Sequence, residues 1–189
     1  MKALRPFRPS PSILTALMLA GLVMSAQALA ETSADADEKP TQTQMQYGDW
    51  TVVCQGDDLQ DCRAMQTLNY RNESGTGRLM SATVRKVVEG PLMMLELPFG
   101  LDLRAGIVVR FDENDEIPLP FTVCLTNGCQ VITLLAPEHE DQFLNAYAMR
   151  VGFRPFGQEE TVVGEFSLKG SAAAMRSLPT PKAPPAEEE

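Results

Sequence analysis

The sequence has little of the residues on which many metal and nucleic-acid sites depend. Its 189 residues include one histidine, His139, and only four cysteines. A single histidine excludes a multi-histidine metal site. The 16 basic residues are outnumbered by 25 acidic ones, and a net charge of −9 disfavours binding to nucleic-acid phosphates. We therefore expect no metal, no cofactor and no nucleic-acid partner.

Long apolar runs are also scarce, and the one that exists lies near the N-terminus. Residues 13–26 are almost uncharged, follow Lys2, Arg5 and Arg8, and precede the small-x-small pattern Ala28-Leu29-Ala30. A membrane-spanning helix needs roughly twenty apolar residues, which disfavours the alternative of an uncleaved anchor. We predict a signal peptide over residues 1–30, no transmembrane helix after cleavage, and a periplasmic or secreted, surface-associated protein with 13 basic and 25 acidic residues.

The four cysteines all follow this segment, in a compartment where disulfide bonds persist. We expect Cys54 to pair with Cys62 and Cys124 with Cys129, because each pair encloses a short polar stretch suited to a hairpin. A four-residue loop around Thr126-Asn127-Gly128 would place Cys124 directly opposite Cys129, whereas a two-residue Asn-Gly loop would place them diagonally. Cross-pairing remains an alternative, since longer loops give greater nominal stabilisation. The spacing lacks the paired Cys-x2-Cys knuckles of a zinc site.

The remaining chain divides by composition. Residues 31–46 are polar and acidic, so we expect a flexible leader, and residues 179–189 form a Pro- and Glu-rich tail that we expect to be disordered. Between them, residues 47–178 are long enough for one hydrophobic core.

Short apolar segments separated by turn residues recur through this central part. The pattern predicts an all-β fold, an antiparallel β-sandwich or barrel-like sandwich. We expect strands over residues 50–54, 62–70, 79–88, 92–97, 106–111, 119–125, 129–135, 149–153 and 162–168. Pro118 and Pro120 favour an edge strand or a strand start, because proline cannot donate a ladder hydrogen bond.

Two helical segments interrupt the strands. Pro137 and the acids after it favour a helix N-terminus, and Phe143, Leu144 and Tyr147 give one apolar stripe. A second, short helical turn is expected over residues 172–178. We interpret both segments as helices that pack against the core, not as functional sites.

Catalytic patterns are weak. His139 stands among acids at the predicted start of a helix, and no Gly-x-Ser-x-Gly elbow is present. The acidic run 112–116, from Asp112 to Glu116, lacks the glycine and distal glutamate of an EF-hand, so we interpret it as a solvated loop and leave cation binding open. We therefore assign no catalytic residue, although a periplasmic hydrolase that uses carboxylates remains the alternative function.

Two apolar features suggest packing or recognition. Met80, Met93 and Met94 are typical of a pliable core, with an adaptable surface as the alternative. The segment Leu97, Pro98, Phe99, Gly100 and Leu101 would be costly to expose in a monomer, so we expect it to fold under the sandwich or to form a partner surface.

Several motifs in order resemble a known family. They are Tyr47-Gly48-Asp49-Trp50 before Cys54, Leu97-Pro98-Phe99-Gly100-Leu101 before Ala105-Gly106-Ile107, Pro120-Phe121-Thr122-Val123-Cys124 before Gly128-Cys129, and Phe166-Ser167-Leu168-Lys169-Gly170. Together they resemble the invasion-associated locus B family of exported bacterial proteins. Ser171 departs from this resemblance, because we expect an aromatic residue there.

The resemblance implies an exported, periplasmic or surface-associated β-protein that binds a protein or another component of the cell envelope. A virulence or host-interaction role is implied in the same way. It supplies no catalytic residues, so an enzyme is not the expected function.

Overall fold

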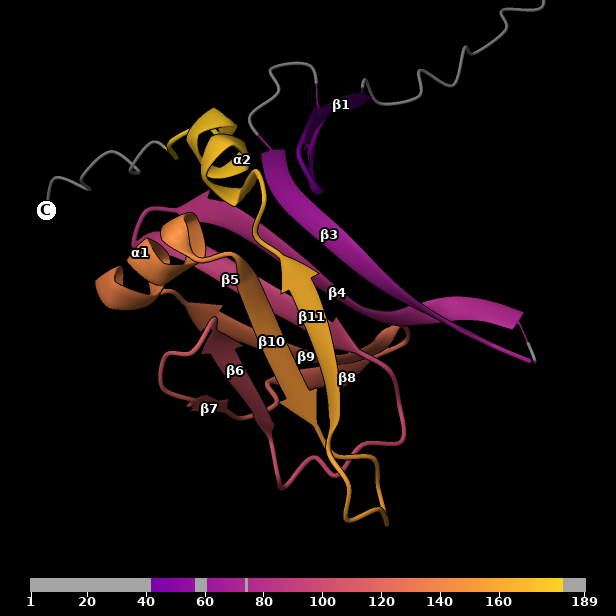
Figure 1. Ribbon diagram of the computed structural model, residues 1–189. Coiled ribbons are helices and arrows are strands. Elements are labelled where there is room, and N and C mark those ends of the chain that lie inside the picture. Colours follow the sequence, from indigo (N-terminus) through magenta and orange to yellow (C-terminus); the bar gives the residue numbers. More distant parts are fainter. Residues whose placement is uncertain (1–41, 57–60, 74, 182–189) are drawn as a thin grey trace, which may run out of the picture. The chain divides into compact units, whose positions relative to one another are not determined.

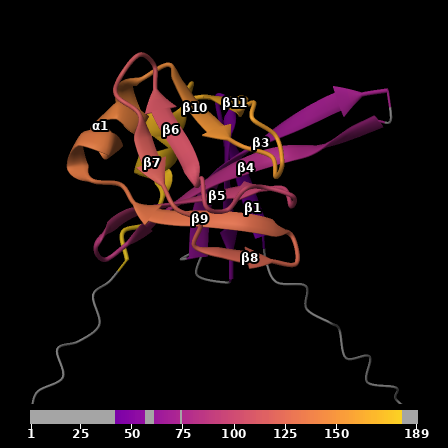
Figure 2. The same cartoon turned by 90° about the horizontal axis from the view of Figure 1, so that it is seen from below.

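The computed structural model describes residues 42–56, 61–73 and 75–181, which form two antiparallel β-sheets facing each other (Figures 1 and 2). The seven-stranded sheet has the order β1 (Gln42–Tyr47), β2 (Trp50–Gln55), β3 (Asp61–Asn72), β4 (Gly75–Val87), β5 (Gly90–Leu97), β9 (Gly128–Leu134) and β8 (Val123–Leu125). The four-stranded sheet has the order β11 (Val162–Ser167), β10 (Ala148–Phe153), β6 (Ile107–Phe111) and β7 (Ile117–Leu119). The predicted sandwich-like all-β fold is confirmed.

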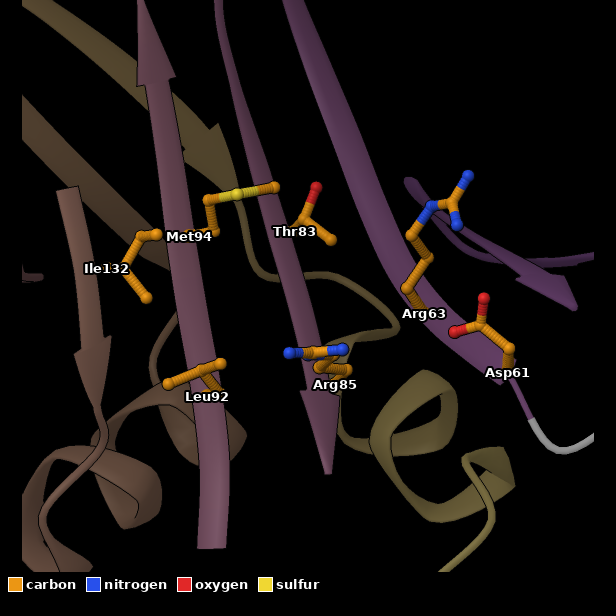
Figure 3. A pocket seen from close by; sticks show the side chains of 7 residues that line it. All are labelled: Asp61, Arg63, Thr83, Arg85, Leu92, Met94 and Ile132. Atoms are coloured by element: carbon orange, nitrogen blue, oxygen red, sulfur yellow. The ribbon is translucent and has the colours of Figure 1, made fainter. Parts of the chain in front are cut away.

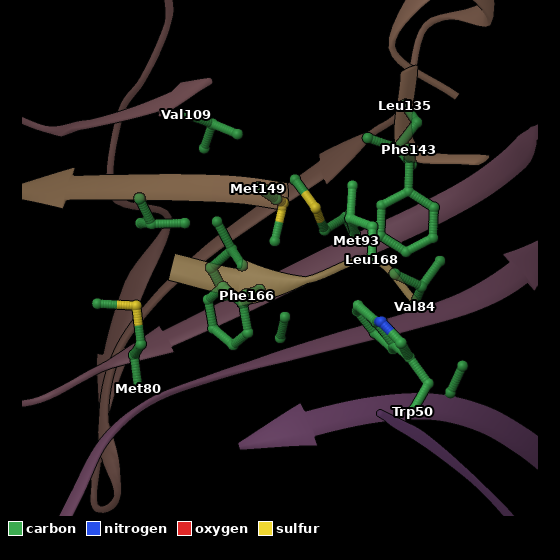
Figure 4. Close-up of a cluster of buried hydrophobic side chains, with 14 of the residues drawn as sticks. Trp50, Met80, Val84, Met93, Val109, Leu135, Phe143, Met149, Phe166 and Leu168 are labelled. Atoms are coloured by element: carbon green, nitrogen blue, oxygen red, sulfur yellow. The ribbon is translucent and has the colours of Figure 1, made fainter. Parts of the chain in front are cut away.

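Alternating side chains create the core between the sheets. On β6 and β10, every second residue is buried, and the buried positions of β4 and β5 face them from the seven-stranded sheet (Figure 4). Helix α1 (Pro137–Asn145) contributes the fully buried Phe143, whose ring meets Trp50 edge-on at a centroid distance of 5.2 Å. Phe111 contacts the same ring at 6.5 Å. Both pairs have the T-shaped geometry that aromatic rings favour.

The first and last family-like motifs lie side by side in space. The backbone N–H of Asp49 donates to the carbonyl of Lys169 at 2.9 Å. Gly48 and Gly170 both have positive φ angles, of 57° and 92°. A Cβ added to Gly170 would lie 2.1 Å from the carbonyl oxygen of Tyr47, so this approach requires glycine.

A buried glutamine reinforces this junction. The side-chain amide of Gln66 on β3 donates to the carbonyls of Asp49 and Ser167, at 3.0 and 2.9 Å, and accepts from the N–H of Ser167 at 3.1 Å. The indole of Trp50 also donates to the carbonyl of Ser167, at 2.9 Å. One side chain thus links the seven-stranded sheet to the edge strand β11 of the other sheet.

Helix α2 (Ser171–Ser177) confirms the expected second helical turn and explains an unexpected residue. Ser171 is buried, and its hydroxyl donates to the carbonyl of Phe143 at 2.9 Å. A small polar side chain therefore fits where the resemblance led us to expect an aromatic residue.

Both predicted disulfide bonds are present. Cys54 pairs with Cys62 across β2 and β3, and Cys124 pairs with Cys129 across β8 and β9. Cys124 lies directly opposite Cys129 in the strand register, as expected for residues that a disulfide joins across a hairpin. Because Leu125 pairs with Gly128, the connecting turn consists of Thr126 and Asn127 alone. The expected four-residue loop is therefore wrong: a two-residue turn one position earlier than Asn127-Gly128 also places the cysteines directly opposite each other.

Two strand predictions need correction. Residues 42–46, expected in the flexible leader, form β1 with Tyr47 and pair with β2, because a neighbouring edge can order a polar segment through its backbone. The expected strand over residues 119–125 is two strands: β7 ends at Leu119 in one sheet and β8 begins at Val123 in the other. Pro118 lies on the edge strand β7, as expected, and Pro120 falls in the crossing between the sheets.

Two side-chain predictions also need correction. Tyr147, expected on the apolar stripe of the helix, lies beyond the end of α1 and is 87% exposed. Met80 and Met93 are buried as expected, but Met94 points to the outer face of the seven-stranded sheet and is half-buried. The predicted signal peptide 1–30, leader residues 31–41 and tail residues 182–189 lie outside the described residues.

Candidate binding surfaces

The apolar segment after β5 mostly turns inward. Leu97 is 1% exposed and Leu101 is 7% exposed, so both belong to the core. Pro98 is half-buried, and Phe99 is 58% exposed. Of the predicted partner surface of Leu97, Pro98, Phe99 and Leu101, the two leucines are therefore unavailable to a partner, and only Phe99, with Pro98 beside it, is accessible. The two leucines hold the loop against the sandwich.

A second exposed aromatic residue joins Phe99 from a distant part of the chain. Phe156, in the loop between β10 and β11, is 70% exposed, and its N–H donates to the carbonyl of Gly100 at 2.7 Å. Leu103, 47% exposed, follows in the β5–β6 loop. We call Phe99 and Phe156 the aromatic tip. The β5–β6 and β10–β11 loops that carry it lie at the lower end of the molecule in Figure 1, away from both helices.

Asp102 fixes the two loops of the aromatic tip to each other. Its N–H donates to the carbonyl of Arg154 at 2.9 Å, and its carboxylate forms ion pairs with Arg154 at 3.1 Å and Arg104 at 3.2 Å. Desolvation alone would raise the pKa of Asp102, but the hydrogen bonds and charge of Arg104, together with a hydrogen bond from Arg154, lower it below its usual value. Asp102 is thus an ionised anchor, and a lowered pKa is unsuited to a general acid at neutral pH.

A different surface lies on the outer face of the seven-stranded sheet. Here a hollow of 540 Å³ crosses strands β3, β4, β5 and β9 (Figure 3). We call it the outer-face groove. Its lining residues are Asp61, Arg63, Thr83, Arg85, Leu92, Met94 and Ile132. The sequence analysis missed this groove, because its residues meet only through the register of four strands.

The two arginines of the outer-face groove lie on adjacent strands. Ala64 and Val84 are paired and buried, so Arg63 and Arg85, one step further along, both project outward. In the described ranges 42–56, 61–73 and 75–181, neither guanidinium forms an ion pair or a side-chain hydrogen bond. Like charges on neighbouring strand positions destabilise a sheet.

Glu96 on the same face offers a contrast. Its carboxylate contacts Arg78 in an ion pair and accepts a hydrogen bond from Gln130 at 3.2 Å. Arg78 also donates to the carbonyl of Asn127 at 2.8 Å. This carboxylate is therefore used to hold β4, β5 and the β8–β9 hairpin together.

The acidic run 112–116 has a structural role in its first residues. The carboxylate of Asp112 accepts hydrogen bonds from the N–H groups of Tyr147 and Ala148, at 3.0 and 2.9 Å. Glu113 forms an ion pair with Arg150 at 3.1 Å. Among the described residues, no group of three or more His, Cys, Asp or Glu side chains is placed to hold a metal ion.

His139 lines a small hollow of 220 Å³ at the side of the sandwich. Its neighbours there are mainly apolar, including Met93, Ile117 and Leu135. The sulfur atoms of all four cysteines are in disulfide bonds, so none offers a thiolate nucleophile. The histidine thus has the surroundings of a packing residue.

Comparison with known proteins decides the family. The family model described as invasion associated locus B (IalB) protein matches residues 50–179. The chain belongs to the IalB family. Its relatives include an invasion protein B homolog of Brucella abortus strain 2308, which is 30% identical over 160 residues, 82% of this chain and 91% of that protein. A homolog from B. abortus biovar 1 strain 9-941 gives the same values.

The IalB fold is also shared with a solved structure. The crystal structure of invasion associated protein B from Bartonella henselae matches with a TM-score of 0.62 and 18% sequence identity, covering 72% of this chain and 95% of that one. At this identity the likeness concerns the fold alone. In the part of this chain that the structure describes, neither helix is long and apolar enough to cross a membrane.

Proposed function

We propose that this chain is a non-catalytic binding protein of the bacterial cell envelope that docks on a protein partner through its aromatic tip. The observation that carries this proposal is the exposure of Phe99 and Phe156 on two loops that are tied together by backbone hydrogen bonds. Rigid, exposed aromatic side chains bury much apolar surface on binding and lose little conformational freedom, which makes them effective interface anchors.

Export is part of the proposal. It rests on the signal-peptide pattern of residues 1–30 and on the two disulfide bonds, which persist outside the reducing cytoplasm. The mature protein would begin at Glu31 and be recovered from the periplasm or the cell surface. The names of the Brucella relatives, invasion protein B homologs, support a role in virulence or host interaction.

The alternative of a carboxylate-dependent hydrolase has less support. Such an enzyme needs two convergent carboxyl groups, one of them with a raised pKa. The outer-face groove is lined by a single carboxylate, Asp61. The one described acid with a clear pKa shift is Asp102, and its pKa is lowered by arginine.

Site-specific photocrosslinking in intact cells tests the proposed docking surface. A photoreactive phenylalanine analogue at position 156 should capture one discrete envelope protein. The same analogue at position 147 should not, because Tyr147 is even more accessible than Phe156 but lies just before β10, outside the aromatic tip. Intact-mass measurement of the recovered protein tests the N-terminus at Glu31.

The captured protein is then purified for affinity measurements. Replacing Phe99 and Phe156 together by serine should weaken its binding at least tenfold, as expected for loss of an interface anchor, while Tyr147→Ser leaves it unchanged. Equal crosslinking from positions 147 and 156 would refute docking through the tip. Crosslinking from position 156 to lipid alone would point to membrane insertion instead of a protein partner.

A further inference from the structure

The outer-face groove combines two features that an ordinary solvent-exposed sheet face does not need. Its cationic part consists of Arg63 and Arg85, which lack an ion-pair partner among the described residues. The two side chains start from neighbouring positions of β3 and β4, but Figure 3 shows the guanidinium of Arg63 pointing away from Arg85. Both flexible side chains must therefore turn toward each other to share one anion. Each guanidinium can donate two parallel hydrogen bonds to one anion, and the several oxygens of a phosphate can accept from both groups.

The apolar part of the groove continues from the arginines across β5 and β9. Leu92 follows Arg85 in the register, and Met94 is paired with Ile132. Ile132 is 37% exposed, and Leu134, paired with Leu92, is 46% exposed. The outer face of an antiparallel sheet is usually polar where it meets water. Figure 3 shows Leu92, Met94 and Ile132 on the same side of the sheet as Arg85.

The backbone around the groove decides between a lipid and a peptide. Strands β3, β4, β5 and β9 are interior strands, so their N–H and C=O groups are used in pairing with neighbours. An extended peptide laid across this face would lose water from its own backbone without gaining hydrogen bonds in return. An acyl chain has no polar groups along its length and meets no such cost.

We infer that the outer-face groove binds a phosphate-headed acyl amphiphile as a single molecule. The phosphate lies between Arg63 and Arg85, and the acyl chain lies over Leu92, Met94 and Ile132. A volume of 540 Å³ is within the usual range of small-molecule sites. This site is separate from the aromatic tip, so it stands or falls independently of the proposed protein partner.

Isothermal titration calorimetry with dodecyl phosphate, kept below its critical micelle concentration, tests the inference on the purified protein. We expect one molecule bound per chain. Arg63→Gln and Arg85→Gln should each weaken binding about tenfold, as expected for a lost hydrogen bond to a charged group. Arg110→Gln is the matched control, because Arg110 lies on the outer face of the other sheet and should leave the affinity unchanged.

Replacing Asp61 should change the affinity for dodecyl phosphate in the opposite direction. Its carboxylate lines the same groove and repels a bound phosphate, so Asp61→Asn should tighten binding of dodecyl phosphate. Ile132→Ser should weaken binding by reducing the apolar contact. Thermal unfolding of every variant monitors folding.

Four results would overturn the inference. Inorganic phosphate binding as tightly as dodecyl phosphate would show that the acyl chain contributes nothing, and dodecyltrimethylammonium binding equally well would exclude the role of the arginines. An acidic peptide of alternating Glu and Leu binding in place of dodecyl phosphate would favour a protein ligand. Binding to phosphatidylglycerol vesicles without binding of the monomeric amphiphile would indicate a membrane surface instead.

Discussion

Replacing Gln66 by methionine should remove the side-chain hydrogen bonds that join the two sheets, with little change in side-chain volume. Gln66 is 9% exposed and forms three hydrogen bonds with the backbones of Asp49 and Ser167. Because β11 is an edge strand, the N–H and C=O of Ser167 that face away from β10 have no neighbouring strand to pair with. The amide of Gln66 takes the place of that missing strand.

The expected cost follows from the number of hydrogen bonds lost. Each contributes about 1 kcal/mol net, and methionine nearly fills the same volume, so Gln66→Met should lower the free energy of unfolding by about 3 kcal/mol. The carbonyl of Ser167 keeps its hydrogen bond from Trp50, which limits the loss. Its N–H keeps no such partner.

Urea unfolding followed by tryptophan fluorescence measures this change, since Trp50 is the only tryptophan and lies at the junction. The midpoint should fall while the m-value stays constant, because the same surface is exposed on unfolding. Gln44→Met is the matched control: Gln44 is exposed on β1, and its replacement should change stability by at most about 0.5 kcal/mol.

A second variant sharpens the test. Gln66→Glu keeps the acceptor for the N–H of Ser167 but points a carboxylate oxygen at the carbonyls of Asp49 and Ser167. It should be less stable than Gln66→Met at neutral pH and recover in acid, when protonation restores one donor. The reasoning is refuted if Gln66→Met unfolds within 1 kcal/mol of the wild type, or if Gln66→Glu is as stable as the wild type at pH 7.

Three further predictions concern the glycine contact, a disulfide bond and the anchor of the aromatic tip. Gly170→Ala should destabilise by about 3 kcal/mol in calorimetry, against about 1 kcal/mol for Gly157→Ala, because both have positive φ but only Gly170 meets backbone atoms; equal losses would contradict this. Replacing Cys124 and Cys129 together by alanine should cost about 2 kcal/mol through loop entropy, and an unchanged melting temperature would argue against that account. The lowered pKa of Asp102 means that its ionised form stabilises the fold above about pH 5, and this contribution is lost as the pH falls through about 4 and below. Asp102→Asn should therefore lower the melting temperature at pH 7 and leave it unchanged near pH 2; an equal loss at both pH values would exclude a role of the charge.

Local patterns in the sequence account for much of the fold. Short apolar runs over residues 106–111 and 149–153 predict two strands, and both exist, because their alternate side chains are buried on one face of the smaller sheet. Cys124 and Cys129 were assigned correctly because the residues that bring them together lie between them. In such cases the partner is a few residues away, so the sequence contains the whole interaction.

Long-range pairing decided what the sequence alone could not. Residues 42–46 carry no apolar pattern, and they become β1 only because the edge of β2 is present to pair with them. Phe156 lies beside the loop of Phe99 because its backbone N–H donates a hydrogen bond to Gly100, more than fifty residues earlier in the chain. Neither feature has a local signal, since both depend on backbone groups that every residue has.

For both candidate surfaces, the sequence determines one part and the tertiary structure another. The sequence by itself determined that Phe99 belongs to an apolar segment, and the tertiary structure decided that its neighbours Leu97 and Leu101 are buried. The sequence gives Arg63 and Arg85 no connection, because a strand register shifted by one residue would send either side chain to the opposite face. Only the pairing of β3 with β4, fixed by which face is buried in the core, brings the two charges together.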